Sequence, residues 1–236
     1  MYGSSFYSGR RSLTARSAAI ILNLIQQRWP FSTVVDVGCG TGTWLSAAKV
    51  LGATWLTGYE GPWVRKDMLD DDDIVLINAD LSESLQPLLV QTRLFDLAIC
   101  VEVGEHLPES RADGLVQDLT TLSDRILFSA AIPGQTGVGH INEQWQSYWR
   151  AKFKAQGFRA LDIIRTVVWH QQDVLTWYRQ NVVVYERSSQ LDEANGPFDI
   201  VHPETLEAYA NPGLKTALRT AAKIPAATLR YLSKRL

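Results

Sequence analysis

The sequence predicts an α/β fold in which a mostly parallel sheet of seven strands carries helices on both faces. Two observations lead to this prediction. Short apolar runs rich in β-branched residues alternate with helical patterns along residues 30–187. The first of these runs, 33–37, breaks into a glycine-rich turn before a helix, which is typical of the carboxyl edge of a parallel sheet. The 236 residues are 46% hydrophobic, which is enough to bury the core of one such domain.

The elements follow one another in an order typical of a crossover-connected sheet. The expected strands are 33–37, 54–59, 74–78, 95–100, 125–130, 158–168 and 181–187. The expected helices are 15–28, 43–51, 63–69, 84–91, 109–121 and 142–156. A loop and a brief turn, without a full helix, separate the last two strands, and this connection favours an antiparallel pair at one edge of the sheet.

The chain divides into three predicted segments. They are a helical lead-in (1–29), the main α/β domain (30–187), and a C-terminal loop with a basic amphipathic tail (188–236). In the lead-in, the apolar run 18–25 is too short to span a bilayer and no small-residue cleavage site follows it. We therefore expect an amphipathic helix that packs on the domain. Serine, asparagine, glycine and proline in 188–212 predict a loop.

The last segment, 213–236, is expected to be a basic helix that Pro225 kinks. Its cations are Lys215, Arg219, Lys223, Arg230, Lys234 and Arg235, and leucines alternate with them. Such a helix can lie on an anionic membrane surface, which would place the protein at the inner face of the membrane. Alternatively, it packs against the body of the protein or against a second subunit. The sequence predicts no oligomeric state.

Composition limits the classes of partner. The net charge of −2 gives no electrostatic reason to expect nucleic acid. The two cysteines, Cys39 and Cys100, fall at the ends of predicted buried strands and indicate reduced thiols in a cytoplasmic protein. No cysteine or histidine spacing in the sequence suggests a metal site.

The glycine-rich turn favours a nucleotide-like ligand, because glycine lets the ligand approach the backbone and the amides of the following helix point toward it. Its glycines are Gly38, Gly40 and Gly42, and Asp36 precedes them. A dinucleotide fingerprint needs its third glycine at position 43, where this chain has Thr43. The spacing therefore disfavours a nicotinamide-dependent enzyme.

The pattern D-x-G-x-G-x-G instead resembles the first motif of the class I S-adenosylmethionine (SAM)-dependent methyltransferases, and the resemblance extends over residues 30–186. It implies a Rossmann-like methyltransferase fold with an antiparallel edge strand, and SAM as the cofactor. It also implies that the turn binds SAM through Asp36, Gly38, Cys39, Gly40 and Gly42. The resemblance further implies that Asp36 organises the loop and lies near the amine of the methionine part of SAM.

Two acidic residues at predicted strand ends complete the expected cofactor site. Glu60 ends the second strand, where a carboxylate can accept both ribose hydroxyls. The resemblance implies that Asp80 accepts a hydrogen bond from the adenine amino group and that the amide of Leu81 donates to the ring. The alternatives are a solvated acid at position 60 and a helix N-cap at position 80. The acidic run 70–73 is expected to be a solvated loop.

The segment 95–108 is similar to the fourth motif of the same family. The similarity places Glu102 at the strand end near the sulfonium of SAM. His106 follows, and histidine is the natural proton acceptor near neutral pH. The alternative for His106 is a packing or capping role at a helix start.

A glycine-containing loop, 131–145, follows the fifth predicted strand and could close over the pocket. It carries His140, the second candidate catalytic base. Candidate acceptor-binding residues in and beyond this loop are Asn142, Glu143, Trp145 and Tyr178. The alternatives are that Asn142 caps the next helix, that Trp145 and Trp149 form an apolar stripe, and that Tyr178 belongs to a packed turn.

The loop and the later W-Y-R-Q-N and V-H-P-E segments resemble methyltransferases of bacterial glycan and glycoconjugate biosynthesis. This resemblance implies O-methylation of a small-molecule or saccharide-type acceptor. Two alternatives stay open. One is methylation of a lipid, a quinone or an amine metabolite, and the other is a non-catalytic SAM-fold subunit that binds a partner.

Overall fold

The computed structural model describes residues 4–89, 94–190 and 198–210, with side chains from residue 12 onward. The chain forms two compact units, residues 1–200 and 201–236. The first unit contains the sheet and every candidate site residue. The described part of the second unit contributes helix α8 (Pro203–Ala210). The predicted tail helix, 213–236, lies outside the described residues.

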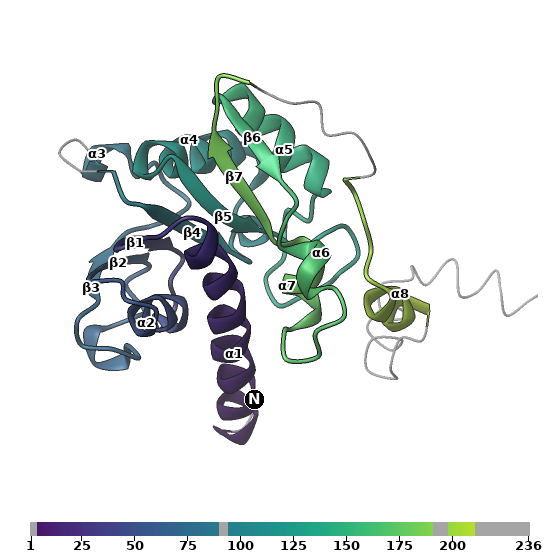
Figure 1. The fold of residues 1–236 in the computed structure, drawn as a ribbon, viewed down its shortest axis with the longest axis horizontal. Helices are drawn as coiled ribbons and strands as arrows, with labels where there is room; N and C mark the ends of the chain where they lie inside the picture. Colours follow the sequence, from purple (N-terminus) through teal and green to yellow (C-terminus); the bar gives the residue numbers. More distant parts are fainter. Residues whose placement is uncertain (1–3, 90–93, 191–197, 211–236) are drawn as a thin grey trace, which may run out of the picture. The chain divides into compact units, whose positions relative to one another are not determined.

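The first unit is built on a seven-stranded sheet with the order β3-β2-β1-β4-β5-β7-β6 (Figure 1). The strands are β1 (Thr33–Val37), β2 (Trp55–Glu60), β3 (Val75–Asn78), β4 (Leu97–Val101), β5 (Arg125–Ser129), β6 (Phe158–Leu161) and β7 (Val183–Arg187). β1 to β5 pair in parallel, whereas β7 is antiparallel to both β5 and β6. The predicted fold class is confirmed, and the antiparallel strand lies one place inside the edge.

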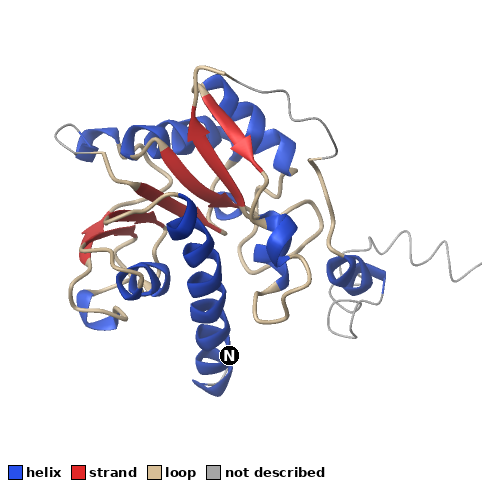
Figure 2. Ribbon diagram, viewed as in Figure 1, coloured by secondary structure: helices blue, strands red, loops and turns tan. Residues whose placement is uncertain are grey.

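Helices cover both faces of this sheet (Figure 2). α1 (Ser4–Arg28) and α2 (Thr43–Val50) lie on one face, and α4 (Ala112–Leu122) and α5 (Gln146–Ala155) lie on the other. Three short helices complete the unit: α3 (Gln86–Leu89), α6 (Arg165–Val168) and α7 (Thr176–Asn181). α1 begins eleven residues before the predicted start at 15.

The apolar strand residues divide between two cores because successive side chains in a strand point to opposite faces. In β4, Ala98 and Cys100 join the core under α4 and α5, whereas Leu97 and Ile99 join the core under α1 and α2. All of these side chains are fully buried. This two-sided burial explains why the strands are continuous apolar runs rather than alternating ones.

The predicted strand 158–168 is wrong in its second half. β6 ends at Leu161, and α6 begins at Arg165. The guanidinium of Arg165 is 1% exposed and donates to both carboxylate oxygens of Asp162 at 2.7 Å. It also donates to the carbonyl of Gln180 at 3.3 Å. These long-range contacts turn the chain after β6, although its residues have high β-propensity.

Two other predicted elements are also wrong. The predicted helix 63–69 is reduced to a single 3-10 turn at Lys66–Met68, and its large apolar residue Trp63 is 67% exposed. The predicted loop 188–212 contains α8. His202 begins this helix, since its Nδ1 accepts a hydrogen bond from the amide of Glu204 at 3.2 Å. Proline at the first helical position is a common start signal, which the sequence analysis did not use.

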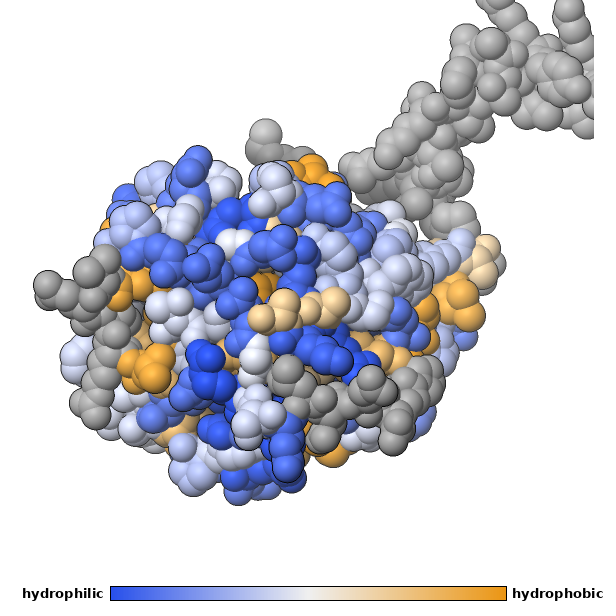
Figure 3. Space-filling view, turned by 90° about the horizontal axis from the view of Figure 1, so that it is seen from above, coloured by the Kyte–Doolittle hydropathy of each residue, from blue (hydrophilic) through white to orange (hydrophobic). Residues whose placement is uncertain are grey.

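The surface is mainly polar on the side that Figure 3 shows, where apolar residues form small, separate patches. Exposed apolar side chains on the chain include Val138, Ile141 and Trp145 of the loop after β5. Within residues 4–89, 94–190 and 198–210, every helix is too short or too polar to cross a bilayer.

Candidate functional site

The glycine-rich turn connects β1 to α2 at the carboxyl edge of the sheet. All three glycines have positive φ: 84° at Gly38, 52° at Gly40 and 82° at Gly42. A Cβ on Gly38 would lie 2.3 Å from Val103, and one on Gly42 would lie 2.5 Å from Ile74. A Cβ on Gly40 would meet nothing within 4 Å. Gly40 is therefore the glycine that faces open space, where a ligand can approach the backbone.

Glu60, the last residue of β2, is bound directly to this turn. Its two carboxylate oxygens accept hydrogen bonds from the amides of Gly40 (2.9 Å) and Gly61 (2.8 Å). The side chain is buried, with 8% exposure. A carboxylate has about four acceptor positions, so two remain for hydroxyl donors. Glu60 is therefore not a solvated acid. Its buried carboxylate is fixed to the glycine-rich turn.

Asp36 lies one residue before the end of β1 and is 1% exposed. Its Oδ1 has no hydrogen-bond partner among the described residues. Burial, with a smaller effect of the charge on Glu60, raises the pKa of Asp36 well above its usual range. A buried acid without a partner is costly unless a ligand cation or donor completes it. The amine of a bound amino acid moiety would do so.

Asp80 and Leu81 follow β3 at the same edge. Asp80 is exposed and accepts hydrogen bonds from the amide (2.9 Å) and hydroxyl (2.7 Å) of Ser82, which lower its pKa. This turn precedes α3 by several residues, so Asp80 does not cap that helix. The N-cap alternative is therefore wrong, and the second oxygen of Asp80 stays open to a ligand donor.

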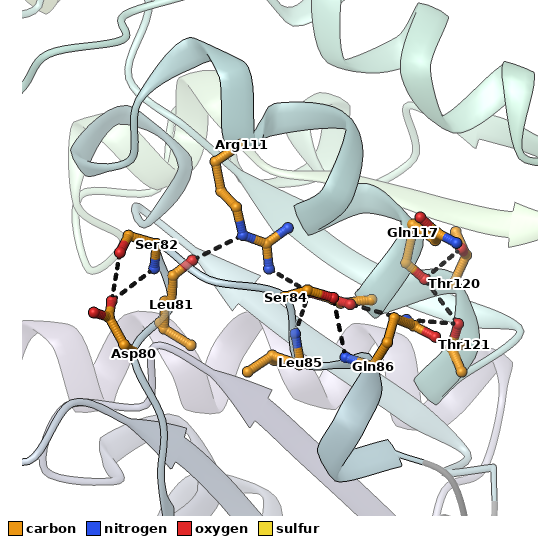
Figure 4. A network of polar contacts seen from close by, with 11 residues as sticks. Asp80, Leu81, Ser82, Ser84, Leu85, Gln86, Arg111, Gln117, Thr120 and Thr121 are labelled. Atoms are coloured by element: carbon orange, nitrogen blue, oxygen red, sulfur yellow. Dashed lines mark hydrogen bonds and ion pairs between the residues drawn. The ribbon is translucent and has the colours of Figure 1, made fainter.

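A buried ion pair holds the loop that carries Leu81 (Figure 4). Arg111 is paired with Asp118 of α4 and donates through Nε to the carbonyl of Leu81 at 3.0 Å. Asp118 also accepts from the amide of Leu85 at 3.1 Å and from Nε2 of Gln86 at 2.8 Å. No local sequence pattern predicts this pair, because its two charges hold a loop about thirty residues away.

Glu102 follows β4 with φ of 55°, which is uncommon for a residue other than glycine. Its carboxylate accepts hydrogen bonds from the side-chain amides of Gln135 and Asn181, each at 3.3 Å. The amide of Gln180 donates to Gln135 at 3.1 Å, which extends this network. Burial raises the pKa of Glu102 despite these donors. The strained backbone and the amide network fix the carboxylate at the strand end.

His140 is held by its neighbour Glu143. One carboxylate oxygen of Glu143 lies 2.8 Å from Nδ1 of His140, and the other accepts the amide of Gly134 at 2.8 Å. Glu143 therefore orients the ring and favours a proton on Nδ1, which leaves a lone pair on Nε2. Nε2 lies 4.0 Å from Oε1 of Glu105.

The side chains of Glu105 and His106 meet His140 at the end of β4. The rings of His106 and His140 are perpendicular, with centroids 4.9 Å apart. Glu105 is fully buried, and burial together with the charge on Glu102 raises its pKa to about 9. Partial burial, and then the neighbouring His140, lower the pKa of His106. The structure thus brings together both histidines that the sequence proposed as bases, and adds a buried acid.

The loop 131–145 is anchored to the end of β4. The amides of Ile141 and Asn142 donate to the carbonyl of Glu105 at 2.8 and 3.1 Å. The side chain of Asn142 donates to the carbonyl of Gly104 at 3.4 Å, and the N-cap of α5 is Trp145. Asn142 therefore does not cap the helix. The apolar-stripe alternative is also wrong, because Trp149 is 2% exposed but Trp145 is 40% exposed.

Tyr178, a candidate acceptor-binding residue, is buried and packs against its neighbours, as in the alternative of a packed turn. It is 6% exposed, and its ring packs edge-on against Trp44 with centroids 5.2 Å apart. Burial, with the charge on Glu102, raises its pKa to about 12. The polar residues of α7 that reach the site are Gln180 and Asn181, which the sequence analysis considered only as part of a segment.

The acidic run 70–73 is a loop, as predicted, and Asp72 and Asp73 are exposed, but three of its carboxylates also contact α2. Asp70 accepts a hydrogen bond from the hydroxyl of Thr43 at 2.7 Å, at the first residue of α2. Asp71 and Asp73 both pair with Lys49 of the same helix, at 2.8 and 2.6 Å. These contacts tie the segment to the helix that follows the glycine turn.

No family model and no curated protein sequence matches the chain. Solved structures do resemble it. DesVI from Streptomyces venezuelae has a TM-score of 0.58 and 17% identity over 78% of this chain and 95% of its own. SAM-bound CalS10, an amino pentose methyltransferase from Micromonospora echinaspora involved in calicheamicin biosynthesis, has a TM-score of 0.57 and 13% identity over 80% of this chain and 98% of its own.

A third similar structure is magnesium protoporphyrin IX methyltransferase (ChlM) from Synechocystis PCC 6803 with bound SAM. Its TM-score is 0.50, and it is 17% identical over 75% of this chain and 80% of its own. At these identities the similarity shows the fold. The chain has the Rossmann-like fold of the class I SAM-dependent methyltransferases.

Proposed function

We propose that the chain is a SAM-dependent methyltransferase that transfers a methyl group to a hydroxyl of a small-molecule or saccharide-type acceptor. One observation carries the proposal. Gly40 faces open space, the Glu60 carboxylate is fixed to its amide, and Oδ1 of the nearby buried Asp36 has no hydrogen-bond partner among the described residues. The fold shared with SAM-bound structures supports SAM as the ligand of this turn.

The residues at the strand ends suit the parts of SAM. Asp36 would compensate the positive amine of the methionine moiety, and the free lone pairs of Glu60 would accept the ribose hydroxyls. Asp80 and the amide of Leu81 would bind the adenine edge, while Cys39 and Gly42 shape the turn. Bound SAM supplies an electrophilic methyl group on a sulfonium centre.

We assign proton removal from the acceptor to the histidine cluster, with His140 as the first candidate and His106 as the second. With a proton on Nδ1 directed at Glu143, Nε2 of His140 would carry the lone pair that accepts the hydroxyl proton. As the acceptor oxygen bonds to the methyl carbon, the carbon–sulfur electron pair stays on sulfur, and Nε2 takes the hydroxyl proton. Glu102, in its amide network, is assigned to the sulfonium side of the site.

The acceptor class rests on the loop after β5. Glu143 supplies a polar group and the 40% exposed Trp145 supplies an aromatic face, a combination that suits a sugar ring, whereas Asn142 is 4% exposed and anchors the loop. The description of CalS10 as an amino pentose methyltransferase supports the same class. A lipid, quinone or amine acceptor is the alternative.

The first experiment is calorimetric titration of the purified protein with SAM and with NAD. The proposal predicts saturable SAM binding at a stoichiometry of about one and no heat with NAD. Isotope-labelled SAM then reports methyl transfer to sugar nucleotides and lipid-linked saccharides. Absence of SAM binding would contradict the proposal and favour a non-catalytic binding subunit.

The histidine assignment makes a separate prediction. Replacing His140 by alanine should lower the methyl-transfer rate about 10²–10⁴-fold, the usual contribution of a general base, with SAM affinity unchanged. The matched control is His170→Ala, since His170 is exposed and lies outside the cluster. A His140→Ala variant with full activity would remove this residue from proton transfer.

Cytoplasmic location, and contact of the basic tail with the inner face of the membrane, remain hypotheses. They agree with a lipid-linked saccharide acceptor, because such a substrate would be presented at that surface.

A further inference from the structure

Three side chains of types that bind metal ions converge at the acceptor side of the site. One donor atom from each of Glu105, His106 and His140 lies within 4.8 Å of the others. His140 is 13% exposed at its side chain, Glu105 is fully buried, and His106 is exposed. The cluster is therefore open to solvent on one side and closed on the other, as a site with a free coordination position requires.

Glu105 supplies an independent observation. No hydrogen bond of ordinary geometry reaches either of its carboxylate oxygens from the described residues. No lysine or arginine pairs with it there, and the contact with His140 at 4.0 Å is its one described ion-pair contact. The amides of Glu105 and Ala131 and the carboxyl of Glu102 are near it, but none forms a hydrogen bond of ordinary geometry. A fully buried carboxylate with such poor partners is costly, and a bound cation would remove that cost.

The lone pair of His140 is available to such a cation. Glu143 fixes the proton on Nδ1, which is the usual arrangement for a histidine that binds metal through Nε2. A Cβ built on Gly137 would lie 2.1 Å from Nε2 and 2.4 and 2.5 Å from the two adjacent ring carbons. A point on the lone-pair axis would be distinctly farther from those carbons. Gly137 therefore covers the face of the ring and does not block the in-plane direction.

We propose that Glu105, His106 and His140 form a binding site for one divalent transition-metal ion. Two imidazoles and one carboxylate suit manganese, iron, cobalt, nickel or zinc. In tetrahedral geometry, bonds of about 2.0–2.2 Å place two donors on one ion about 3.3–3.6 Å apart, so the widest separation in the cluster must close by about 1 Å. The exposed ring of His106 can make this adjustment. Glu102 interacts with Glu105 and is a further carboxylate beside the cluster.

The role of the ion rests on the proposed function, although the site itself does not. An ion held here would bind the acceptor hydroxyl and lower its pKa, so that the hydroxyl proton would pass to solvent water and no histidine base would be needed. His140 then holds the ion through the same lone pair that would otherwise take the proton. His140 cannot be a metal ligand and a proton acceptor through Nε2 at the same time. Measured metal binding would favour the ligand role.

The test uses the full chain, freed of metal by chelation and dialysis, with Co²⁺ as the probe. Visible absorption and calorimetry follow Co²⁺ binding to the unsubstituted protein and to the variants Glu105→Gln, His106→Ala and His140→Ala. His170→Ala is the matched control. SAM titration and thermal unfolding of every protein show whether the fold and the cofactor site are intact.

We expect one Co²⁺ per chain, ten-fold or weaker binding in each cluster variant, and unchanged binding in His170→Ala. Absence of Co²⁺ binding, or equal binding by all proteins, overturns the metal site. If SAM still binds in that case, the proposed function stands without the metal. If Co²⁺ binds and SAM does not, the proposed function fails and the metal site stands. Because His106 is exposed, His106→Ala is expected to fold. This variant therefore tests the metal site even if Glu105→Gln does not fold.

Discussion

The carboxylate of Glu60 links the glycine turn to the cofactor it is proposed to bind. Replacing Glu60 by alanine removes a charged acceptor, and such hydrogen bonds contribute about 1.5–3 kcal/mol. SAM affinity should therefore fall about 10- to 150-fold. Calorimetry measures the change, and Glu83→Ala, at an exposed acid, is the control. Unchanged affinity in Glu60→Ala would remove this residue from the ribose site.

Gly40 allows a second test at the scale of one residue. A Cβ there has free space but a positive φ, so Gly40→Ala should lose only about 1–2 kcal/mol of folding stability. The methyl group would project to where the ligand is proposed to lie, so SAM affinity should fall at least about ten-fold. Gly52→Ala is the matched control, since Gly52 also has positive φ and free space but lies outside the site. Equal SAM affinity in both variants would contradict the placement of the ligand.

Individual residues also show what the sequence could and could not predict. The positions of Glu60 and Asp80 at strand ends followed from local patterns, because a strand that ends in a turn is a signal of a few residues. The amide network around Glu102 could not be predicted from such local patterns. Asn181 lies 79 residues from Glu102 and 46 from Gln135. Only the folded sheet brings such residues together, and for the same reason the contact of His140 with Glu105 and His106 could not be predicted.

At the scale of elements, α4 controls the loop that follows β3. Asp118 is 1% exposed, so Asp118→Asn would leave the buried Arg111 without its counter-charge. Breaking a buried pair in this way costs about 3–5 kcal/mol, which urea unfolding should record. Asp113→Asn on the same helix is the control. Its side chain is 81% exposed, and its pair with Lys152 should contribute less than about 1 kcal/mol. A similar small loss in both variants would show that the buried pair is not important for the loop.

The elements that the sequence mispredicted share a physical cause. Residues 162–168 contain β-branched side chains, yet Arg165 is drawn into buried contacts with distant carbonyls and the segment becomes helical. Tertiary contacts thus outweigh local propensity. The strands β1, β2, β4 and β5 were predicted closely because burial on both faces produces continuous apolar runs.

At the scale of the whole molecule, five parallel strands and the start of β7 direct their loops to one edge of the sheet, so cofactor binding should stabilise the unit as a whole. A ligand at 100 times its Kd adds about 2.7 kcal/mol to the free energy of unfolding. For a unit of about 200 residues, this corresponds to a rise in Tm of about 5–10 °C. Scanning calorimetry with saturating SAM should record that rise, while NAD at the same concentration should leave Tm unchanged. A rise with NAD and none with SAM would mean that the glycine spacing does not select the ligand, and the dinucleotide class would replace the methyltransferase proposal.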